Sequence, residues 1–250
     1  MSAALRTVGL GKTFGGFKAN SDVSVSFAAG ARHALIGPNG AGKTTFINLL
    51  TGVLPPTSGE VYLGDERITS LPQHARVKRG MTRTFQINTL FPGLTALESV
   101  VLACCEQRGR GGVWWRTAAS ERGAIDQANG ILAQLKLDRD AGTVTRELPY
   151  GKQRLLEIAL ALATGPKVLL LDEPAAGIPS AESAELFAVI ASLPRDVTIV
   201  FIEHDMNLVF KFAERITVLV SGMVLVEGTP DEIAGDRRVR EVYLGEAEHA

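Results

Sequence analysis

A chain of 250 residues is long enough for one large α/β domain, or for a core domain that carries a smaller inserted subdomain. Hydrophobic residues make up 46% and charged residues 21% of the sequence, a balance typical of a folded globular protein rather than a disordered or fibrous one. The formal net charge of -1 gives no broad basic surface, so we expect no nucleic-acid partner.

The sequence also predicts no membrane span and no disulfide or zinc framework. Its first residues lack a positively charged start followed by an apolar stretch, and no run of about 18 apolar residues occurs. Cys104 and Cys105 are neighbours, which disfavours a bond between them, and no Cys/His cluster has zinc-ligand spacing. We therefore expect a cytosolic protein that does not itself cross a membrane.

The first part of the chain predicts β structure, then a strand, a glycine-rich loop and a helix. Alternating apolar residues predict a half-buried strand over residues 22–28, with a weaker candidate over residues 5–10. A short apolar strand at Arg32–Ile36 runs into the glycine-rich loop, and a helical pattern follows from Phe46 to near Gly52. Another strand is predicted over residues 60–63.

The remaining strands alternate with helical patterns. Strands are predicted over residues 81–85, 167–172 and 198–204, and the last two are continuous apolar runs, as expected of strands buried on both faces of a parallel sheet. Between Gln86 and about residue 164 the strand signals stop, and helices are predicted over residues 97–105, 120–137 and 153–163. A glycine-rich, basic segment with Trp114 and Trp115 joins two of them as a loop.

Near the end of the chain, Ser221-Gly222 lies between two β-rich runs like a hairpin turn, and residues 230–244 have a helical pattern. The predicted fold is therefore an α/β protein that has a parallel sheet, an antiparallel β portion and an inserted helical subdomain. The predicted boundaries place residues 1–86 and 165–250 in the core and residues 87–164 in the subdomain.

Residues 37–44 read GPNGAGKT and fit the G-x-x-x-x-G-K-[ST] pattern of a phosphate-binding loop. Glycines let backbone N–H groups turn toward phosphate oxygens, and the following helix directs its positive end at them. Lys43 is expected to reach the β and γ phosphates of ATP, and the Thr44 hydroxyl to bind Mg²⁺. The predicted nucleotide-binding residues here are Gly37, Pro38, Asn39, Gly40, Ala41, Gly42, Lys43, Thr44 and Thr45.

The apolar run before Asp172 and Glu173 ends in two acids. A P-loop ATPase needs one carboxylate for Mg²⁺ and another that orients or deprotonates water, and the end of a buried strand is the place for them. Asp172 is the candidate metal ligand, and Glu173 is the candidate base.

With these motifs in place, the chain resembles the nucleotide-binding subunit of ABC transporters along essentially its whole length. Residues 148–154, LPYGKQR, occupy the place of the family signature LSGGQ. The resemblance implies that Gln86 touches Mg²⁺ or water, that His204 lies near the γ-phosphate, and that Phe14 stacks on adenine, with Phe17 close enough to compete. Residues 175–180 correspond to the loop that the family calls the D-loop.

Finer marks resemble the importer ATPases for branched-chain amino acids: RTFQ at residues 83–86, IEHDM at 202–206 and VYLGE at 242–246. Importers for urea or short amides share much of this pattern, and an ATPase for lipid or lipopolysaccharide export shares the short single-core layout. A soluble ABC ATPase acting on ribosomes or DNA is disfavoured, because the chain has one P-loop, no sustained heptads and no basic excess.

The resemblance also implies partners: a second ABC ATPase subunit, two transmembrane permease subunits and a periplasmic or extracellular solute-binding protein. It places the chain peripherally at the cytoplasmic face of the cell membrane. Four departures from the family pattern concern contacts across the ATPase dimer: Pro149 replaces the signature Ser, Lys152 replaces Gln or Glu, Leu160 replaces an Arg, and Pro179 replaces the D-loop Asp. These departures favour a heterodimer with a related ATPase that has a fuller signature.

Overall fold

The structure, a computed structural model, describes residues 3–84, 90–109 and 122–247. Three predicted features lie outside the described residues: Gln86, the last residue of the strand predicted over residues 81–85, and the loop with Trp114 and Trp115.

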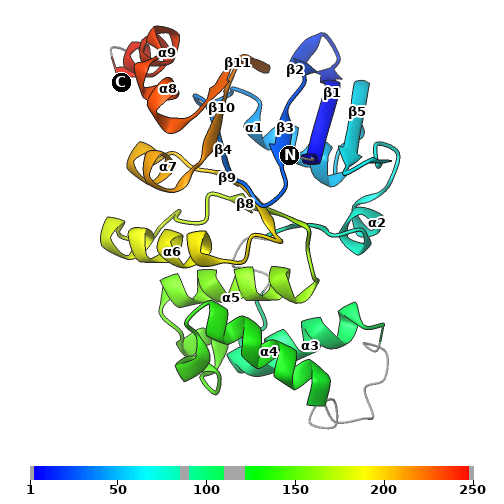
Figure 1. The fold of residues 1–250 in the computed structure, drawn as a ribbon, viewed down its shortest axis with the longest axis vertical. Helices are drawn as coiled ribbons and strands as arrows, with labels where there is room; N and C mark the ends of the chain where they lie inside the picture. Colours follow the sequence, from blue (N-terminus) through cyan, green and yellow to red (C-terminus); the bar gives the residue numbers. More distant parts are fainter. Residues whose placement is uncertain (1–2, 85–89, 110–121, 248–250) are drawn as a thin grey trace.

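The described residues form two β-sheets with helices between and around them (Figure 1). The strands are β1 (Ala3–Phe14), β2 (Phe17–Val23), β3 (Ser26–Ala28), β4 (Arg32–Ile36), β5 (Ser58–Leu63), β6 (Glu66–Arg67), β7 (Met81–Arg83), β8 (Val168–Asp172), β9 (Thr198–Ile202), β10 (Arg215–Val220) and β11 (Met223–Gly228). The helices are α1 (Lys43–Thr51), α2 (Gln73–Lys78), α3 (Ala96–Gln107), α4 (Arg122–Gln134), α5 (Tyr150–Ala163), α6 (Ser180–Ser192), α7 (Met206–Phe212), α8 (Pro230–Gly235) and α9 (Arg237–Ala247), with short 3₁₀ helices at Asp138–Asp140 and Thr145–Glu147. In this part of the chain no helix is long and apolar enough to cross a membrane.

The larger sheet has the strand order β11-β10-β4-β9-β8-β7. Strands β10, β4, β9, β8 and β7 run parallel, and β11 pairs with β10 in the antiparallel sense. The turn of this hairpin is Ser221-Gly222, and both residues have positive φ, of 49° and 78°. The predicted α/β fold, with a parallel sheet and an antiparallel portion, is confirmed.

The smaller sheet is antiparallel, with the order β2-β1-β5-β6 and with β3 also paired to β1. The single strand predicted over residues 22–28 is wrong, because the chain forms β2 and β3 on either side of a break. The Thr7 hydroxyl fills this break, since it donates to Val23 O (2.8 Å) and accepts from Val25 N (3.1 Å). Val23, Val25 and Phe27 are all buried, so the alternation predicted the correct buried face.

The larger sheet is covered on both faces. One face packs with α1 and the smaller sheet, through buried residues such as Leu170 and Val200. The other face packs with helices α3 to α7, through residues such as Leu169 and Phe201. Helix α1, which follows the glycine loop, therefore lies between the two sheets.

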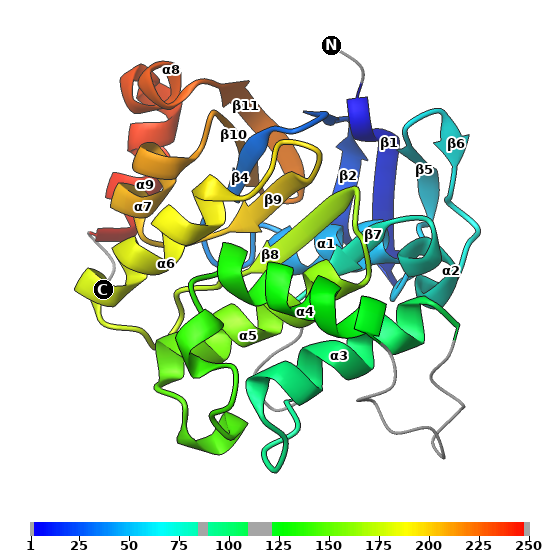
Figure 2. The same ribbon diagram turned by 60° about the horizontal axis from the view of Figure 1, so that its bottom comes forward.

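Three helices form where they were predicted between Gln86 and residue 164. Figure 2 shows α3, α4 and α5 beside one another, below the larger sheet. Helix α4 ends at Gln134, before the predicted limit of residue 137, because Lys136 has a φ of 56° and the next N–H, of Leu137, bonds back to Leu132 O (2.8 Å). The buried side chains of α3, α4 and α5 form one continuous core with those of the larger sheet. A separate subdomain over residues 87–164 therefore stays a prediction.

Helices α2 and α6 and strand β6 form where no element was predicted. Two of them are short, which leaves little periodicity to detect. In α6 the buried residues include the adjacent pairs Leu186-Phe187 and Val189-Ile190, a broad apolar face without a sharp helical repeat.

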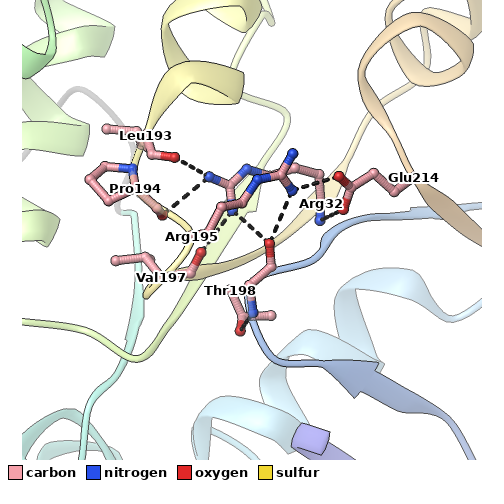
Figure 3. Close-up of polar contacts among 8 residues, drawn as sticks. Arg32, Leu193, Pro194, Arg195, Val197, Thr198 and Glu214 are labelled. Carbon is pink, nitrogen blue, oxygen red and sulfur yellow. Dashed lines mark hydrogen bonds and ion pairs between the residues drawn. The ribbon is translucent and has the colours of Figure 1, made fainter. Parts of the chain in front are cut away.

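The start of β4 is fixed by a buried arginine (Figure 3). Arg32 is 2% exposed, and its guanidinium donates to Val197 O (2.8 Å), Pro194 O (3.3 Å) and Leu193 O in the loop between α6 and β9. The Glu214 carboxylate accepts from the backbone N–H of Arg32 (3.0 Å) and from the Arg195 side chain. One buried cation thus satisfies carbonyls of the loop that follows α6, among them that of Leu193 at the helix end.

Next to Arg32, His33 is completely buried in β4. Its Nε2 lies 2.8 Å from the Thr217 hydroxyl, and its ring packs edge-on against Phe27. Burial, together with the nearby charge of Arg215, lowers the pKa of His33 from 6.5 to about 3. The folded protein therefore holds this imidazole neutral, whereas an unfolded chain protonates it below about pH 6.5.

We expect this difference in pKa to make the protein less stable in mild acid. The unfolded state binds the extra proton, so the free energy of unfolding falls by roughly 1 kcal/mol per pH unit as the pH drops from about 6 to 4. Urea unfolding of the chain between pH 4 and 7 measures this slope. His33→Gln is expected to flatten it by that amount, whereas His74→Gln, at an exposed position, is expected to leave it unchanged. An equal slope in the wild type and His33→Gln would contradict the assignment.

Candidate active site

The glycine-rich loop connects β4 to α1 and is shaped by glycines that no other residue can replace. Gly42 has a φ of 92°, and a Cβ on it would lie 2.5 Å from Ala19 O; a Cβ on Gly37 would clash with Leu219 O. The loop is held from both sides, because Gly222 N donates to Ala41 O (3.0 Å) and the Asn20 side chain donates to Gly42 O (3.3 Å). The β10–β11 hairpin and β2 thereby fix its backbone.

Lys43 begins α1 directly after this loop and is 8% exposed. Its ammonium donates to the carbonyls of Gly37 and Pro38, so the side chain lies across the loop. The N-cap residue of α1 is Gly42, which makes no side-chain capping bond. The N–H groups in the first turn of a helix have no acceptor within the helix, so the start of α1, beside a buried ammonium, favours a phosphate there.

A cavity of about 330 Å³ lies over the loop. It brings together residues from four regions of the chain, and its described lining residues are Phe17, Ala19, Asn39, Gly40, Ala41, Gly42, Lys43, Thr44, Thr45, Glu173 and His204. Of the predicted loop residues, Gly37 and Pro38 instead lie below it as acceptors for Lys43. The cavity therefore joins the glycine loop to the candidate base and to the predicted histidine.

The aromatic residue on the cavity wall is Phe17, whereas Phe14 is not among the lining residues. The two residues face each other in the β1–β2 hairpin, and both are exposed. Lys12 lies over the Phe14 ring, with its Nζ 5.2 Å from the ring centre. The structure thus favours Phe17 over Phe14 as the flat apolar surface for a base.

The two acids at the end of β8 point to different partners. Asp172 forms an ion pair with Arg83, which also donates to the Asn48 side chain (2.8 Å). Glu173 has a φ of 49°, a conformation that is unfavourable for a residue with a Cβ, and its Oε1 lies 2.8 Å from His204 Nε2. The strained backbone therefore directs Glu173 away from Asp172 and toward His204.

Beyond the cavity, the segment that resembles the family signature lies at the start of α5. Pro149 is the residue before the helix, and the Tyr150 hydroxyl donates to Ala176 O (3.2 Å), in the loop that follows Glu173. Lys152 pairs with Asp140 (2.8 Å). Pro179 holds the same position before α6.

Arg83 and Glu203 belong to the motifs RTFQ and IEHDM, but the sequence predicted no role for either residue. Arg83 contacts the candidate metal ligand, and Glu203 is buried between the two loops that carry Glu173 and His204. An acid beside a histidine at the end of a buried apolar run was the available signal. Gln86 lies outside the described residues.

Known proteins are similar to this chain in sequence and in fold. A family model for ABC transporters matches residues 20–176, and a model for the branched-chain amino acid ATP-binding cassette transporter matches residues 223–249. The chain is 40% identical to the high-affinity branched-chain amino acid transport ATP-binding protein BraF of Pseudomonas aeruginosa, with 97% of this chain and 98% of that protein covered. It is 41% identical to the protein LivG of Escherichia coli, which has the same description, with 99% and 100% covered.

Solved structures agree with this similarity. An ATP-binding cassette of an ABC transporter in its ADP conformation superposes with a TM-score of 0.86 at 31% identity, covering 98% of this chain and 99% of that one. A dimeric bacterial ABC transporter cassette superposes with a TM-score of 0.73 at 28% identity, covering 90% and 98%. The chain belongs to the ABC transporter family, as one of its ATP-hydrolysing cassettes.

Proposed function

We propose that this cassette powers the uptake of branched-chain or related hydrophobic amino acids. The relatives described as branched-chain amino acid transport ATP-binding proteins match 97% and 99% of the chain, which supports this solute class. The second family model supports it independently, because it matches residues 223–249, outside the part shared by ABC transporters in general.

One observation carries the proposed chemistry: Glu173 and His204 meet at 2.8 Å on the wall of the cavity that contains the glycine loop. The loop N–H groups and Lys43 bind the phosphates of ATP and stabilise the charge that develops during transfer. The Glu173 carboxylate then accepts a proton from the attacking water. His204 holds the carboxylate in place through their contact.

We further propose that Thr44 and Asp172 hold Mg²⁺, with Gln86 as a third candidate. Within the described part of the chain no three His, Cys, Asp or Glu side chains gather into a metal cluster. A hydroxyl and one carboxylate fit Mg²⁺ nonetheless, because this ion usually keeps waters and takes its other ligands from substrate phosphates. Arg83 holds the Asp172 carboxylate beside α1. When bound, Mg²⁺ neutralises phosphate charge.

The family acts with membrane permease subunits, and solved cassettes include dimers. For this chain we propose a second ATPase subunit, two permease subunits and a solute-binding protein, with the cassette at the cytoplasmic face of the membrane. Pro149 and Pro179 support a heterodimer: each precedes a helix without making a side-chain capping bond, and proline has neither a hydroxyl nor an N–H for a facing phosphate.

The first prediction tests the nucleotide site and the solute together. We expect Lys43→Ala to remove most ATP affinity, because the ammonium at the start of α1 is lost, and to abolish leucine uptake by cells that depend on this transporter. Calorimetric titration with ATP and uptake of labelled leucine measure the two effects. Lys78→Ala, an exposed lysine on α2, is the matched control and is expected to change neither. Loss of urea uptake with normal leucine uptake would contradict the proposed solute.

The second prediction concerns the base. Glu173→Gln keeps the size of the side chain but cannot accept the proton, so we expect turnover to fall by about 10²-fold or more while ATP still binds. Steady-state phosphate release and ATP titration separate these effects. Glu185→Gln, on the exposed side of α6, is the matched control and is expected to keep full turnover. Preserved turnover in Glu173→Gln would move the base elsewhere, with His204 the next candidate.

The third prediction concerns the heterodimer. The isolated chain is expected to hydrolyse ATP poorly, because a homodimer places Pro149 at both sites. Pro149→Ser supplies a hydroxyl, and a hydrogen bond to a charged phosphate is worth about 1.5–3 kcal/mol, so turnover is expected to rise by about 10- to 100-fold. Pro149→Ala removes the ring without adding the hydroxyl and is expected to give no such gain. Fast hydrolysis by the unmodified chain, with no gain from serine, would refute the idea.

A further inference from the structure

Glu203 has an ionisable side chain in a buried position, where a charge is unfavourable. It follows β9 directly, is 6% exposed, and lies between the candidate base Glu173 and His204. Burial raises the pKa of its carboxyl, and the neighbouring charge of Glu173 acts in the same direction. Within the described residues it forms no ion pair, unlike the other buried glutamate, Glu157, which pairs with Arg154 at 3.0 Å.

The hydrogen bonds of Glu203 connect two loops. Its Oε1 accepts from the backbone N–H of Ala175 (2.9 Å), two residues after Glu173, and its Oε2 accepts from the backbone N–H of His204 (3.2 Å). These are the loops whose side chains meet at the cavity. A buried carboxylate whose hydrogen bonds, among the described residues, come from the backbone N–H groups of two loops constrains the backbone itself.

The Glu173 loop needs such a constraint because its backbone is strained. Glu173 has a φ of 49°, and on one side its N–H is held by Ile202 O (3.1 Å), the last residue of β9. On the other side, the bond from Ala175 to Glu203 holds the loop against the same strand end. A left-handed conformation in a residue with a Cβ persists only where its surroundings over-determine it.

We propose that Glu203 is a positioning residue for ATP hydrolysis: its carboxylate holds the loop of Glu173 and the loop of His204 in the one relation that brings those two side chains into contact. This proposal rests on the proposed function, since it assumes that Glu173 and His204 act on ATP. Glu203 is not among the described residues that line the cavity.

The test compares variants of the full chain in single-turnover hydrolysis of labelled ATP, with chain in excess so that slow rates are measurable. Glu203→Ala removes both acceptors, and we expect at least about a 10-fold lower rate with the ATP Kd changed less than about 2-fold. Glu203→Gln keeps one acceptor oxygen and is expected to fall between Glu203→Ala and the wild type. Glu214→Gln is the matched control: it changes another glutamate that accepts a backbone N–H, that of Arg32, but at the opposite end of the parallel strands, and it should keep the rate.

A double variant separates positioning from general loss of structure. If Glu203 acts through His204, adding Glu203→Ala to His204→Ala lowers the rate by less than about 2-fold more. The proposal would be overturned if the rate losses of Glu203→Ala and His204→Ala multiply in the double variant. It would also be overturned if both Glu203 variants have rates within about 2-fold of the wild type. Thermal unfolding identifies a variant that fails to fold, in which case Glu203→Gln decides. Loss of hydrolysis in Glu173→Gln in the same assay supports Glu173 as the base; if that variant is as fast as the wild type, the proposed role of Glu173 fails, and this result is distinct from a failure of the role of Glu203.

Discussion

The parallel pairing of β8 with β9 is the constraint on which the candidate active site depends. Asp172 is in register with Ile202, so the residues that follow the two strands, Glu173 and Glu203, lie next to each other, and His204 comes directly after Glu203. Glu173 and His204 are far apart in the sequence and are brought together by this register. Because both strands are buried on their two faces, neither can slip without moving apolar side chains out of the core.

The glycine loop depends on a second pairing. Strand β4 lies between β10 and β9, so the loop after β4 emerges at the same sheet edge as Glu173 and His204. The β10–β11 turn and β2 then hold the loop backbone through Gly222 and Asn20. Since Asn20 belongs to the smaller sheet, the candidate active site is built where the two sheets meet at the start of α1, and both must be in place for the loop to keep its shape.

Much of the fold and of the candidate active site was predictable from local sequence patterns. The buried apolar runs of β4, β8 and β9, the glycine loop and the acids at the strand end each carry their signal within a few residues. The break between β2 and β3 was not predictable, because it depends on the hydroxyl of Thr7 from another strand. Likewise, Phe14 and Phe17 flank one hairpin turn, and only the three-dimensional arrangement shows which of them lines the cavity. The roles of Arg83 and Glu203 required the same information.

Residues at the two ends of the parallel strands in the larger sheet differ in burial and in backbone strain. At the edge where the parallel strands begin, Arg32 is fully buried and satisfies carbonyls of the α6–β9 loop. At the edge where they end, Glu173 has a strained backbone and a half-exposed side chain, and Lys43 lies across carbonyls of its own loop. A strained backbone lowers stability, and a protein tolerates it where the chemistry needs it. Contacts where the strands begin thus stabilise the fold, whereas the geometry where they end serves the candidate active site.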